Sequence, residues 1–280
     1  MKNISPLNEP FFLPAITNAI SSGMGEPVIL VHGMSASLHD WDELIPELVQ
    51  AGYSAHALDL LGHGESAKPG SRFYQVEWLF EHMAAWIDSL ALTRPAVLVG
   101  HSLGGYLVLE YARRFPSRVR ALVLVDPFYR HEQLPAWLRL YYRQASFNMG
   151  LIERLPGWML RMVIDVSSLS LGHGPGVYFL PEHVRAQTVQ DFKRTAAGVY
   201  NIPNNMDDLT PYLSEIQQHS LLAWGTRDTT LSPASFLELE AALPQVVAHR
   251  LSAGHVPHQS NASEFNGLVL DFLRELVPAY

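Results

Sequence analysis

The sequence predicts an α/β fold in which helices cover both faces of a mostly parallel central sheet. Short, continuous apolar runs alternate with segments in which apolar residues recur at helical spacing. A continuous apolar run is typical of a strand that is buried on both faces, as strands of parallel sheets are. The chain has 280 residues, of which 48% are hydrophobic, and is long enough to bury such a core. We therefore expect one core domain with right-handed crossover connections.

The first part of the chain repeats strand and helix. The run Val28-Ile29-Leu30-Val31 is apolar throughout and ends at His32-Gly33, as expected of a buried strand. A segment with apolar residues at helical spacing follows and stops at Gly52, a residue type that commonly ends helices. We expect strands over residues 15–21, 28–31 and 54–60 and helices over residues 41–51 and 76–90.

The most informative motif is Gly100-His101-Ser102-Leu103-Gly104, which separates an apolar run from a helical run that Pro116 closes. A serine in such a tight strand-to-helix turn keeps its hydroxyl clear of the backbone, and the glycines let strand and helix pack closely. The pentapeptide also arises in loops by chance, but the strand before it and the helix after it favour a nucleophile. Leu103 is the first residue of the expected helix, so its amide N–H has no partner within the helix and can point at a developing oxyanion.

The pattern changes after a strand expected over residues 120–125. From Phe128 to Asn205 no buried strand is convincing, and helix-like stretches are broken by Pro156 and by residues 172–176. This predicts a helical lid, or cap, over residues 128–205, inserted into a core domain of residues 1–127 and 206–280. Most of its large apolar residues should fill the core of the insertion, and some should face a cleft. These residues are Trp137, Tyr141, Tyr142, Phe147, Met149, Trp158, Met159 and Met162.

The alternation resumes in the last part of the chain, with strands expected over residues 220–225 and 246–251 and helices over residues 233–243 and 264–276. Each of these strands is followed by a residue suited to acid–base chemistry. Asp228 follows the first strand and His255 follows the second. Because the carboxyl ends of parallel strands meet at one edge of the sheet, both residues should lie near Ser102.

A serine that attacks a carbonyl carbon requires a base to accept its proton and an acid to orient that base. His255 is the candidate base and Asp228 the candidate acid, in one of the known chain orders of serine triads. Asp126 is a second candidate acid, because it ends the strand over residues 120–125. We prefer Asp228, because its loop is long enough to reach His255. Pro127 should instead hold Asp126 extended, as an anchor for the exit into the lid.

Composition excludes several classes of function. The 19 basic and 27 acidic residues give a formal net charge of −8 without a basic stripe, so no nucleic acid partner is expected. The chain has no cysteine, which rules out disulfides, thiolate metal sites and a catalytic thiol. Pro10 and Pro14 interrupt the apolar N-terminal stretch, and no segment is long enough for a membrane span. A soluble, cytoplasmic protein is the expectation.

Five segments, in this order, resemble the α/β-hydrolase superfamily, and in particular its lidded, esterase-like members. They are His32-Gly33 with Trp41, Asp59-Leu60-Leu61-Gly62-His63-Gly64-Glu65-Ser66, the serine motif, Trp224-Gly225-Thr226-Arg227-Asp228, and Gly254-His255. The resemblance extends over nearly the whole chain from Val28 onward. It implies an α/β-hydrolase fold and an oxyanion hole formed by the backbone N–H groups of Met34 and Leu103.

The remaining histidines have other expected roles. The side chain of His101 should point away from Ser102, and His32 should brace the oxyanion loop. The segment Pro257-His258-Gln259 departs from the pattern of many relatives, so His258 competes with His255 for the role of base. Because no third ligand stands near these two histidines in the sequence, we expect no metal site. No cofactor is expected either, since no complete nucleotide-binding motif is present.

The residues together predict a serine hydrolase that forms an acyl-enzyme with a small or medium, apolar carboxylic ester. The same triad also cleaves C–C bonds, lactones or thioesters, and these alternatives stay open. A further alternative from another class is a small-molecule receptor that uses the lid as a gate. The oligomeric state is left open by the sequence.

Overall fold

In the computed structural model, the described residues are 17–70, 74–143, 155–170 and 180–276. They form a seven-stranded sheet in the order β1-β3-β2-β4-β5-β6-β7. Only β1 runs antiparallel to its neighbour, and the other strands are parallel. The strands are β1 Ala19–Ser22, β2 Glu26–Val31, β3 Tyr53–Leu58, β4 Ala96–His101, β5 Val119–Val125, β6 His219–Gly225 and β7 Val246–Leu251. The predicted fold class is confirmed.

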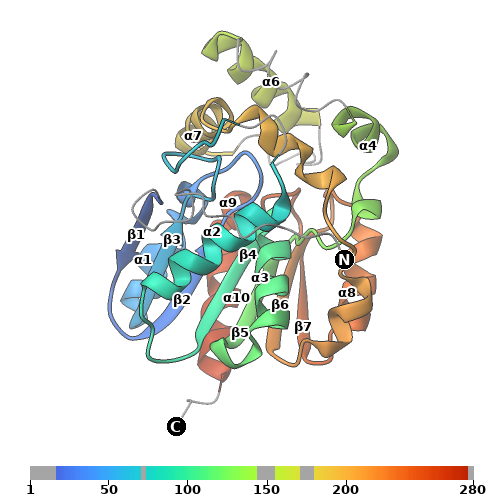
Figure 1. Ribbon diagram of the computed structural model, residues 1–280. Coiled ribbons are helices and arrows are strands. Elements are labelled where there is room, and N and C mark those ends of the chain that lie inside the picture. Colours follow the sequence, from blue (N-terminus) through green and yellow to red (C-terminus); the bar gives the residue numbers. More distant parts are fainter. Residues whose placement is uncertain (1–16, 71–73, 144–154, 171–179, 277–280) are drawn as a thin grey trace.

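The central strands are buried on both faces, which explains their continuous apolar sequences. In β4, Leu98 belongs to one apolar cluster, whereas Val97 and Val99 belong to another. Helices α2, α3 and α8 supply the first cluster, and α1 and α10 supply the second (Figure 1). The sheet is therefore the middle layer of three, as the alternating sequence predicts.

The helices of the core follow the predicted order with two differences. They are α1 Ile45–Gln50, α2 Val76–Ser89, α3 Leu103–Arg114, α8 Pro233–Ala242, α9 Pro257–Ser260 and α10 Ala262–Glu275. The short α9 was not predicted, and the helix expected over residues 41–51 begins later, as α1, after a separate 3-10 helix, Leu38–Trp41. Pro46 lies in the first turn of α1, where its missing N–H is tolerated, so a new helix begins there.

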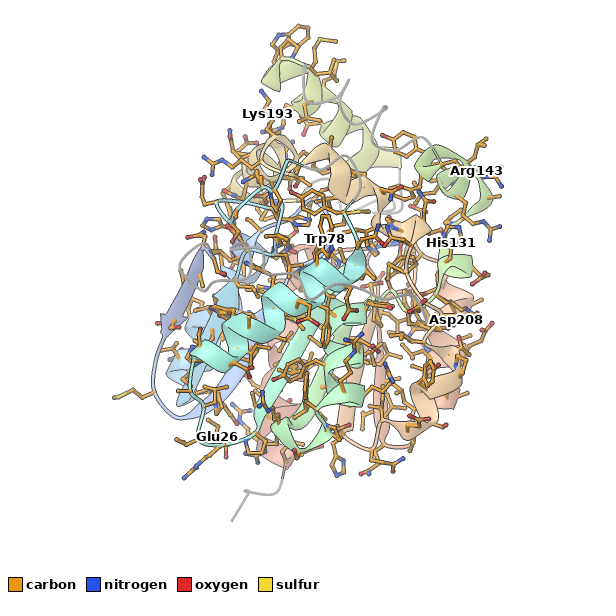
Figure 2. The ribbon with its side chains drawn as sticks, in the orientation of Figure 1. Glu26, Trp78, His131, Arg143, Lys193 and Asp208 are labelled. Atoms are coloured by element: carbon orange, nitrogen blue, oxygen red, sulfur yellow. The ribbon has the colours of Figure 1, made fainter. Side chains whose placement is uncertain are left out.

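The chain between β5 and β6 contains helices α4 Ala136–Tyr142, α6 Gly157–Ser170 and α7 Glu182–Lys193. These helices lie beyond one end of the sheet (Figure 1). Glu26, at the start of β2, lies at the opposite end of the molecule from Arg143 and Lys193 (Figure 2). The insertion therefore lies at the carboxyl ends of the parallel strands. The predicted break at residues 172–176, with Phe147 and Met149, falls outside the described residues.

Within the part of the chain that the structure describes, no helix combines the length and the apolar character that crossing a bilayer requires.

Candidate active site

Ser102 occupies a strained turn between β4 and α3. Its backbone angles are φ 49° and ψ −113°, a region that residues other than glycine rarely adopt. A side chain at Gly100 would lie 2.5 Å from the carbonyl oxygen of Gly104, and one at Gly104 would lie 2.1 Å from the carbonyl oxygen of Val31, so both positions require glycine. The turn is held by the N–H of Ser102, which donates to the carbonyl of Val125 at 3.0 Å. The hydroxyl is thus fixed at the carboxyl end of the sheet.

His255 lies in the loop between β7 and α9 and contacts the serine directly. Its Nε2 is 3.0 Å from Ser102 Oγ, and its Nδ1 is 2.7 Å from Asp228 Oδ2. The carboxylate can only accept, so Nδ1 carries the proton when Asp228 is ionised, and the Nε2 lone pair then faces the hydroxyl. The structure brings together the three residues that the sequence singles out for the triad.

Asp228 is buried and surrounded by hydrogen-bond donors. Its Oδ1 accepts from the backbone N–H groups of Thr230 at 2.7 Å and Leu231 at 3.0 Å, and its Oδ2 faces His255. Burial acts to raise the pKa of this carboxyl, but the interaction with His255 and the two backbone donors outweigh burial and lower the pKa. Asp228 is therefore held as a carboxylate beside the imidazole.

Asp126 lies next to Asp228, but its backbone differs from the expectation. Its φ is 39°, so the prediction that Pro127 holds it extended is wrong. Two tertiary contacts fix this conformation: the N–H of Asp126 donates to the carbonyl of Ala223 at 3.1 Å, and its Oδ1 accepts from the N–H of Gly225 at 3.0 Å. Contacts with the end of β6 thus override the local preference.

The predicted oxyanion hole involves two segments beside the serine. Leu103 is the first residue of α3, so its N–H has no partner within the helix. A side chain at Gly33 would lie 3.2 Å from Cβ of Ser102, so the chain that leads into Met34 passes directly beside the nucleophile. His32 braces this loop as expected: its Nε2 accepts from the N–H of Leu60 at 3.0 Å, and its Nδ1 donates to the carbonyl of Gly33 at 2.7 Å.

A second buried group, which the sequence reasoning missed, consists of Asp40, His101 and His258. Asp40 Oδ2 is 3.5 Å from His101 Nδ1 and 3.8 Å from His258 Nε2. His101 points away from the serine and donates its Nε2–H to the carbonyl oxygen of His255 at 2.8 Å. His258 lies against Trp41, with ring centroids 4.9 Å apart. His258 therefore belongs to a different cluster from the serine, which favours His255 as the base.

Two sets of side chains bring metal-ligand atoms within 4.8 Å of one another among the described residues. They are Asp40 with His101 and His258, and Asp126 with Asp228 and His255. The sequence offered no third ligand near His258, because Asp40 comes from the distant 3-10 helix Leu38–Trp41. In the second set, a metal ion would displace the hydrogen bond between Asp228 and His255.

Leu103, the residue after the serine, belongs to an apolar cluster that extends into the insertion. Leu103 and Phe128 belong to the same apolar cluster as Tyr142, Val199 and Ile202 of the insertion. Of the large apolar residues expected mostly to fill the core of the insertion, Tyr142 is buried, whereas Trp137, Trp158 and Met162 are exposed and do not fill it. A polar contact also crosses between the two parts: Ser35 Oγ donates to the hydroxyl of Tyr200 at 2.6 Å.

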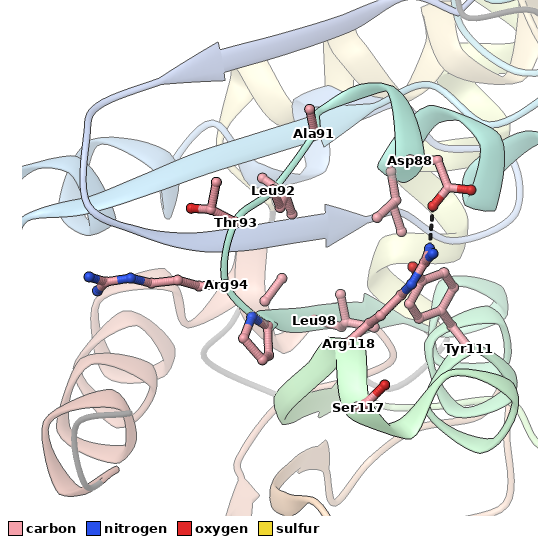
Figure 3. A pocket seen from close by; sticks show the side chains of 12 residues that line it. Asp88, Ala91, Leu92, Thr93, Arg94, Leu98, Tyr111, Ser117 and Arg118 are labelled. Carbon is pink, nitrogen blue, oxygen red and sulfur yellow. Dashed lines mark hydrogen bonds and ion pairs between the residues drawn. The ribbon is translucent and has the colours of Figure 1, made fainter. Parts of the chain in front are cut away.

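A cavity of 330 Å³ lies elsewhere, at the amino end of β4 (Figure 3). Its lining includes Leu92, Arg94, Tyr111 and Arg118, and Arg118 is paired with Asp88. None of the residues around Ser102 lines this cavity, and no nucleophile paired with a base is found there among the described residues. It is separate from the chemistry of the serine.

The family follows from the motifs, the fold and one comparison. Residues 26–262 match the family described as alpha/beta hydrolase fold. The chain belongs to the α/β-hydrolase family. This α/β-hydrolase has its serine at the strand-to-helix turn and its histidine after the last strand, as the resemblance implied.

Individual relatives share a low sequence identity with this chain or match only part of it. Lipase 1 of Psychrobacter immobilis is 24% identical over 83% of this chain and 72% of its own length. A 2-hydroxy-6-oxo-2,4-heptadienoate hydrolase of Pseudomonas putida is 41% identical over 39% of this chain and 40% of its own. The solved structure of a thermophilic esterase from Thermogutta terrifontis has a TM-score of 0.78, with 24% identity and 93% of each chain covered. The family and the sequence relatives support a hydrolytic enzyme.

Proposed function

We propose that this α/β-hydrolase is a serine hydrolase that cleaves small or medium carboxylic esters through an acyl-enzyme. The observation that carries the proposal is the position of one imidazole between a strained serine and a carboxylate. His255 lies 3.0 Å from Ser102 Oγ and 2.7 Å from Asp228 Oδ2. A nucleophile, a base and an orienting acid within hydrogen-bond distance form the constellation that acyl transfer needs.

In the proposed acylation step, Ser102 Oγ attacks the ester carbonyl carbon while His255 Nε2 accepts its proton. Asp228 holds Nδ1 protonated, so that Nε2 is the free base, and it stabilises the imidazolium that forms. The carbonyl oxygen becomes an oxyanion that the N–H groups of Met34 and Leu103 stabilise. The tetrahedral intermediate collapses when the C–O bond to the alcohol breaks, and the alcohol leaves with the proton from His255.

In the deacylation step, a water molecule replaces the alcohol. His255 Nε2 accepts a proton from this water, whose oxygen attacks the acyl carbon, and the same oxyanion hole is used again. The bond between the acyl carbon and Ser102 Oγ then breaks, and His255 returns its proton to the serine. The products are a carboxylic acid and an alcohol, and the enzyme is regenerated without a cofactor.

The substrate class is inferred from the groups around the serine. The apolar cluster that contains Leu103 and Phe128 continues into the insertion, which favours an uncharged, apolar acyl or alcohol portion. We propose that residues 128–205 act as a lid over this region. Within the insertion, Arg161 is paired with Asp165 and Glu182. A lid over the half-buried Ser102 would limit the length of the acyl chain, so short to medium acyl groups are expected.

Cleavage of a C–C bond is the second candidate. It is favoured by the relative from Pseudomonas putida, which is named a 2-hydroxy-6-oxo-2,4-heptadienoate hydrolase and shares 41% identity over 116 residues. The triad serves either reaction, so the residues that contact the leaving group decide between them. A lid-gated receptor is less well supported, because all three triad residues are present within hydrogen-bond distance.

The experiment is a substrate panel measured with the wild-type protein and with Ser102→Ala. The panel contains p-nitrophenyl esters from acetate to palmitate, a lactone, a thioester and a vinylogous diketone that yields an acid on C–C cleavage. We expect the highest kcat/KM for short to medium esters, abolished in Ser102→Ala. Preference for the diketone would replace the ester proposal with the C–C alternative. Faster turnover of long-chain emulsions would identify a lipase, and no turnover with a ligand-dependent thermal shift would indicate a receptor.

A further inference from the structure

We propose that Asp126 is a neutral carboxylic acid at physiological pH and donates a hydrogen bond to the Asp228 carboxylate. Asp126 is then a positioning residue for the triad, which acts through Asp228. The kinetic part of this inference rests on the proposed serine hydrolase function. The protonation state of Asp126 does not, and it can be measured in the absence of any substrate.

The first argument is the placement of the two carboxyl groups. Oxygen atoms of Asp126 and Asp228 and a ring nitrogen of His255 lie within 4.8 Å of one another. Asp126 is fully buried, with 0% of its surface exposed, and Asp228 is 4% exposed. Two carboxylates this close in a buried site repel each other strongly, so one of them keeps its proton.

The second argument is the distribution of hydrogen-bond donors, which decides which carboxyl keeps the proton. Asp228 accepts from His255 and from the N–H groups of Thr230 and Leu231. Asp126 accepts only from the N–H of Gly225, through Oδ1, among the described residues. Hydrogen-bond donors stabilise the charged form of a carboxyl. Asp228, which has three donors, is therefore ionised, and Asp126 is the carboxyl that keeps its proton.

The third argument is the orphaned oxygen of Asp126. Its Oδ2 is buried and finds no hydrogen-bond partner among the described residues. A buried carboxylate oxygen without a donor is costly, whereas a protonated Oδ2 becomes a donor itself. The groups that face Asp126 and can accept this proton or carry charge are Asp228 and His255, and Nδ1 of His255 already faces Asp228. Asp228 has lone pairs left to accept the bond.

The electrostatics of the site agree with this assignment. Burial and the neighbouring charge of Asp228 raise the pKa of Asp126 well above its ordinary range, and the N–H of Gly225 opposes this only in part. The pKa of Asp228 is lowered instead. Environments that push the pKa values of two neighbouring carboxyls apart assign them different roles. Asp228 faces the imidazole with its charge, and Asp126 holds Asp228 in place without adding a second negative charge.

The direct test is infrared difference spectroscopy of the substrate-free protein at about pH 7.4, with the spectrum of Asp126→Asn subtracted from that of the wild type. The subtraction also removes any carboxylic acid signal of Asp191, whose pKa is raised to about 7, because both proteins contain this residue. We expect the C=O stretch of one neutral carboxylic acid, shifted by deuterium exchange and missing in Asp126→Asn. Asp271→Asn, an exposed control outside the site, should keep the signal. A spectrum of Asp126→Asn identical to that of the wild type would overturn the proposal, whatever reaction the enzyme catalyses.

The kinetic test uses the acid limb of the pH profile of kcat/KM. Asparagine is tolerated at positive φ and keeps an N–H donor, so Asp126→Asn is a suitable variant. We expect kcat to fall a few-fold in Asp126→Asn and about tenfold or more in Asp126→Ala, which offers no donor. The midpoint of the acid limb should stay in place in Asp126→Asn, because no charge is removed.

If Asp126 is ionised in the wild type, Asp126→Asn removes a negative charge close to His255. The midpoint of the acid limb would then move down by about one pH unit or more, and this result would overturn the proposal. Thermal unfolding of each variant separates these effects from a loss of folding, which would lower the melting temperature without moving the midpoint. Failure of the proposed function would appear differently, as unchanged activity in Ser102→Ala, and would leave the infrared result intact.

Discussion

Two groups of aspartate and histidine side chains lie next to each other, one that includes His255 and one that bonds to its backbone. They differ in the chemistry that they can support. The first consists of Asp228 and His255 with Ser102, and its two contacts measure 2.7 and 3.0 Å. The second consists of Asp40, His101 and His258, and its contacts to Asp40 measure 3.5 and 3.8 Å. The first group includes the hydroxyl of Ser102, which can act as a nucleophile. It is also accessible to solvent, since 18% of the His255 side chain is exposed, whereas only 1% of the His258 side chain is.

The comparison teaches that residue types alone do not define a catalytic group. Burial lowers the pKa of His101 to about 4, despite the opposing effect of Asp40, so this imidazole is uncharged at neutral pH. Burial also acts to raise the pKa of Asp40, but the neighbouring His101 and His258 oppose this and lower it, and Asp40 Oδ1 accepts from the side-chain amide of Gln259 at 3.0 Å. Without a nucleophile or access to substrate, the second group can only support the backbone of His255, through the hydrogen bond from His101.

Replacement of Ser102 should have the largest effect, because no residue of the second group can act as nucleophile. Ser102→Ala should lower kcat by about 10³- to 10⁶-fold, as removal of a triad residue does in serine hydrolases, with an unchanged melting temperature. Steady-state kinetics on the best ester of the panel provide the measurement. Activity above a tenth of the wild-type level would exclude Ser102 from the mechanism.

The two aspartates provide the next comparison. Asp228→Asn should lower kcat by about 10²- to 10⁴-fold, because an amide favours the wrong imidazole tautomer and does not stabilise the imidazolium. The matched variant Asp40→Asn changes the other group, and its kcat should fall by less than about tenfold. Equal losses in kcat for the two variants would show that the groups do not divide their roles in this way.

His101 should have a smaller effect that depends on its donor. In His101→Leu the carbonyl of His255 loses its hydrogen bond from His101. The loop should then shift, so kcat should fall by roughly 5- to 20-fold. His101→Gln places an amide N–H near the position of Nε2 and should restore most of this loss. Kinetics and thermal unfolding of both variants provide the measurement, and equal activity in the two would argue against the hydrogen bond as the cause.

The smallest effect concerns stability near the second group. Burial, assisted by the charge of Asp40, raises the pKa of Asp191 in α7 to about 7 from an ordinary value of 3.8. Between pH 3.8 and about 7 the folded state therefore keeps a proton on Asp191 that the unfolded state has released. The free energy of unfolding falls as the pH rises through this range and stays low above about pH 7.

Asp191→Asn should raise the melting temperature relative to the wild type at pH 8, by about 2–6 °C, and less at pH 5. Gln187 can still donate to the side-chain oxygen of asparagine, as it does to Asp191 at 2.8 Å. The gain should shrink in the Asp40→Asn background, because one source of the raised pKa is then removed. A gain independent of pH would contradict the account of Asp191.

The core fold and the triad could be predicted because their signals are local. The apolar runs of β2 and β4, the glycines around Ser102 and the residues after β6 and β7 can each be recognised within a few positions, and parallel strands bring them to one edge. The group of Asp40, His101 and His258 could not be predicted, because no local motif marks Asp40 or His258 as a partner of His101, and their meeting depends on tertiary packing. The φ of Asp126 was also missed, since it depends on contacts with the end of β6.

The central claim is that Ser102 is the nucleophile that His255 activates. Its most direct test is labelling with a fluorophosphonate probe, followed by mass spectrometry of the peptides. We expect one adduct per chain, located on Ser102, with labelling abolished in Ser102→Ala and greatly slowed in His255→Gln. An adduct on another residue, or labelling that persists in Ser102→Ala, would contradict the claim.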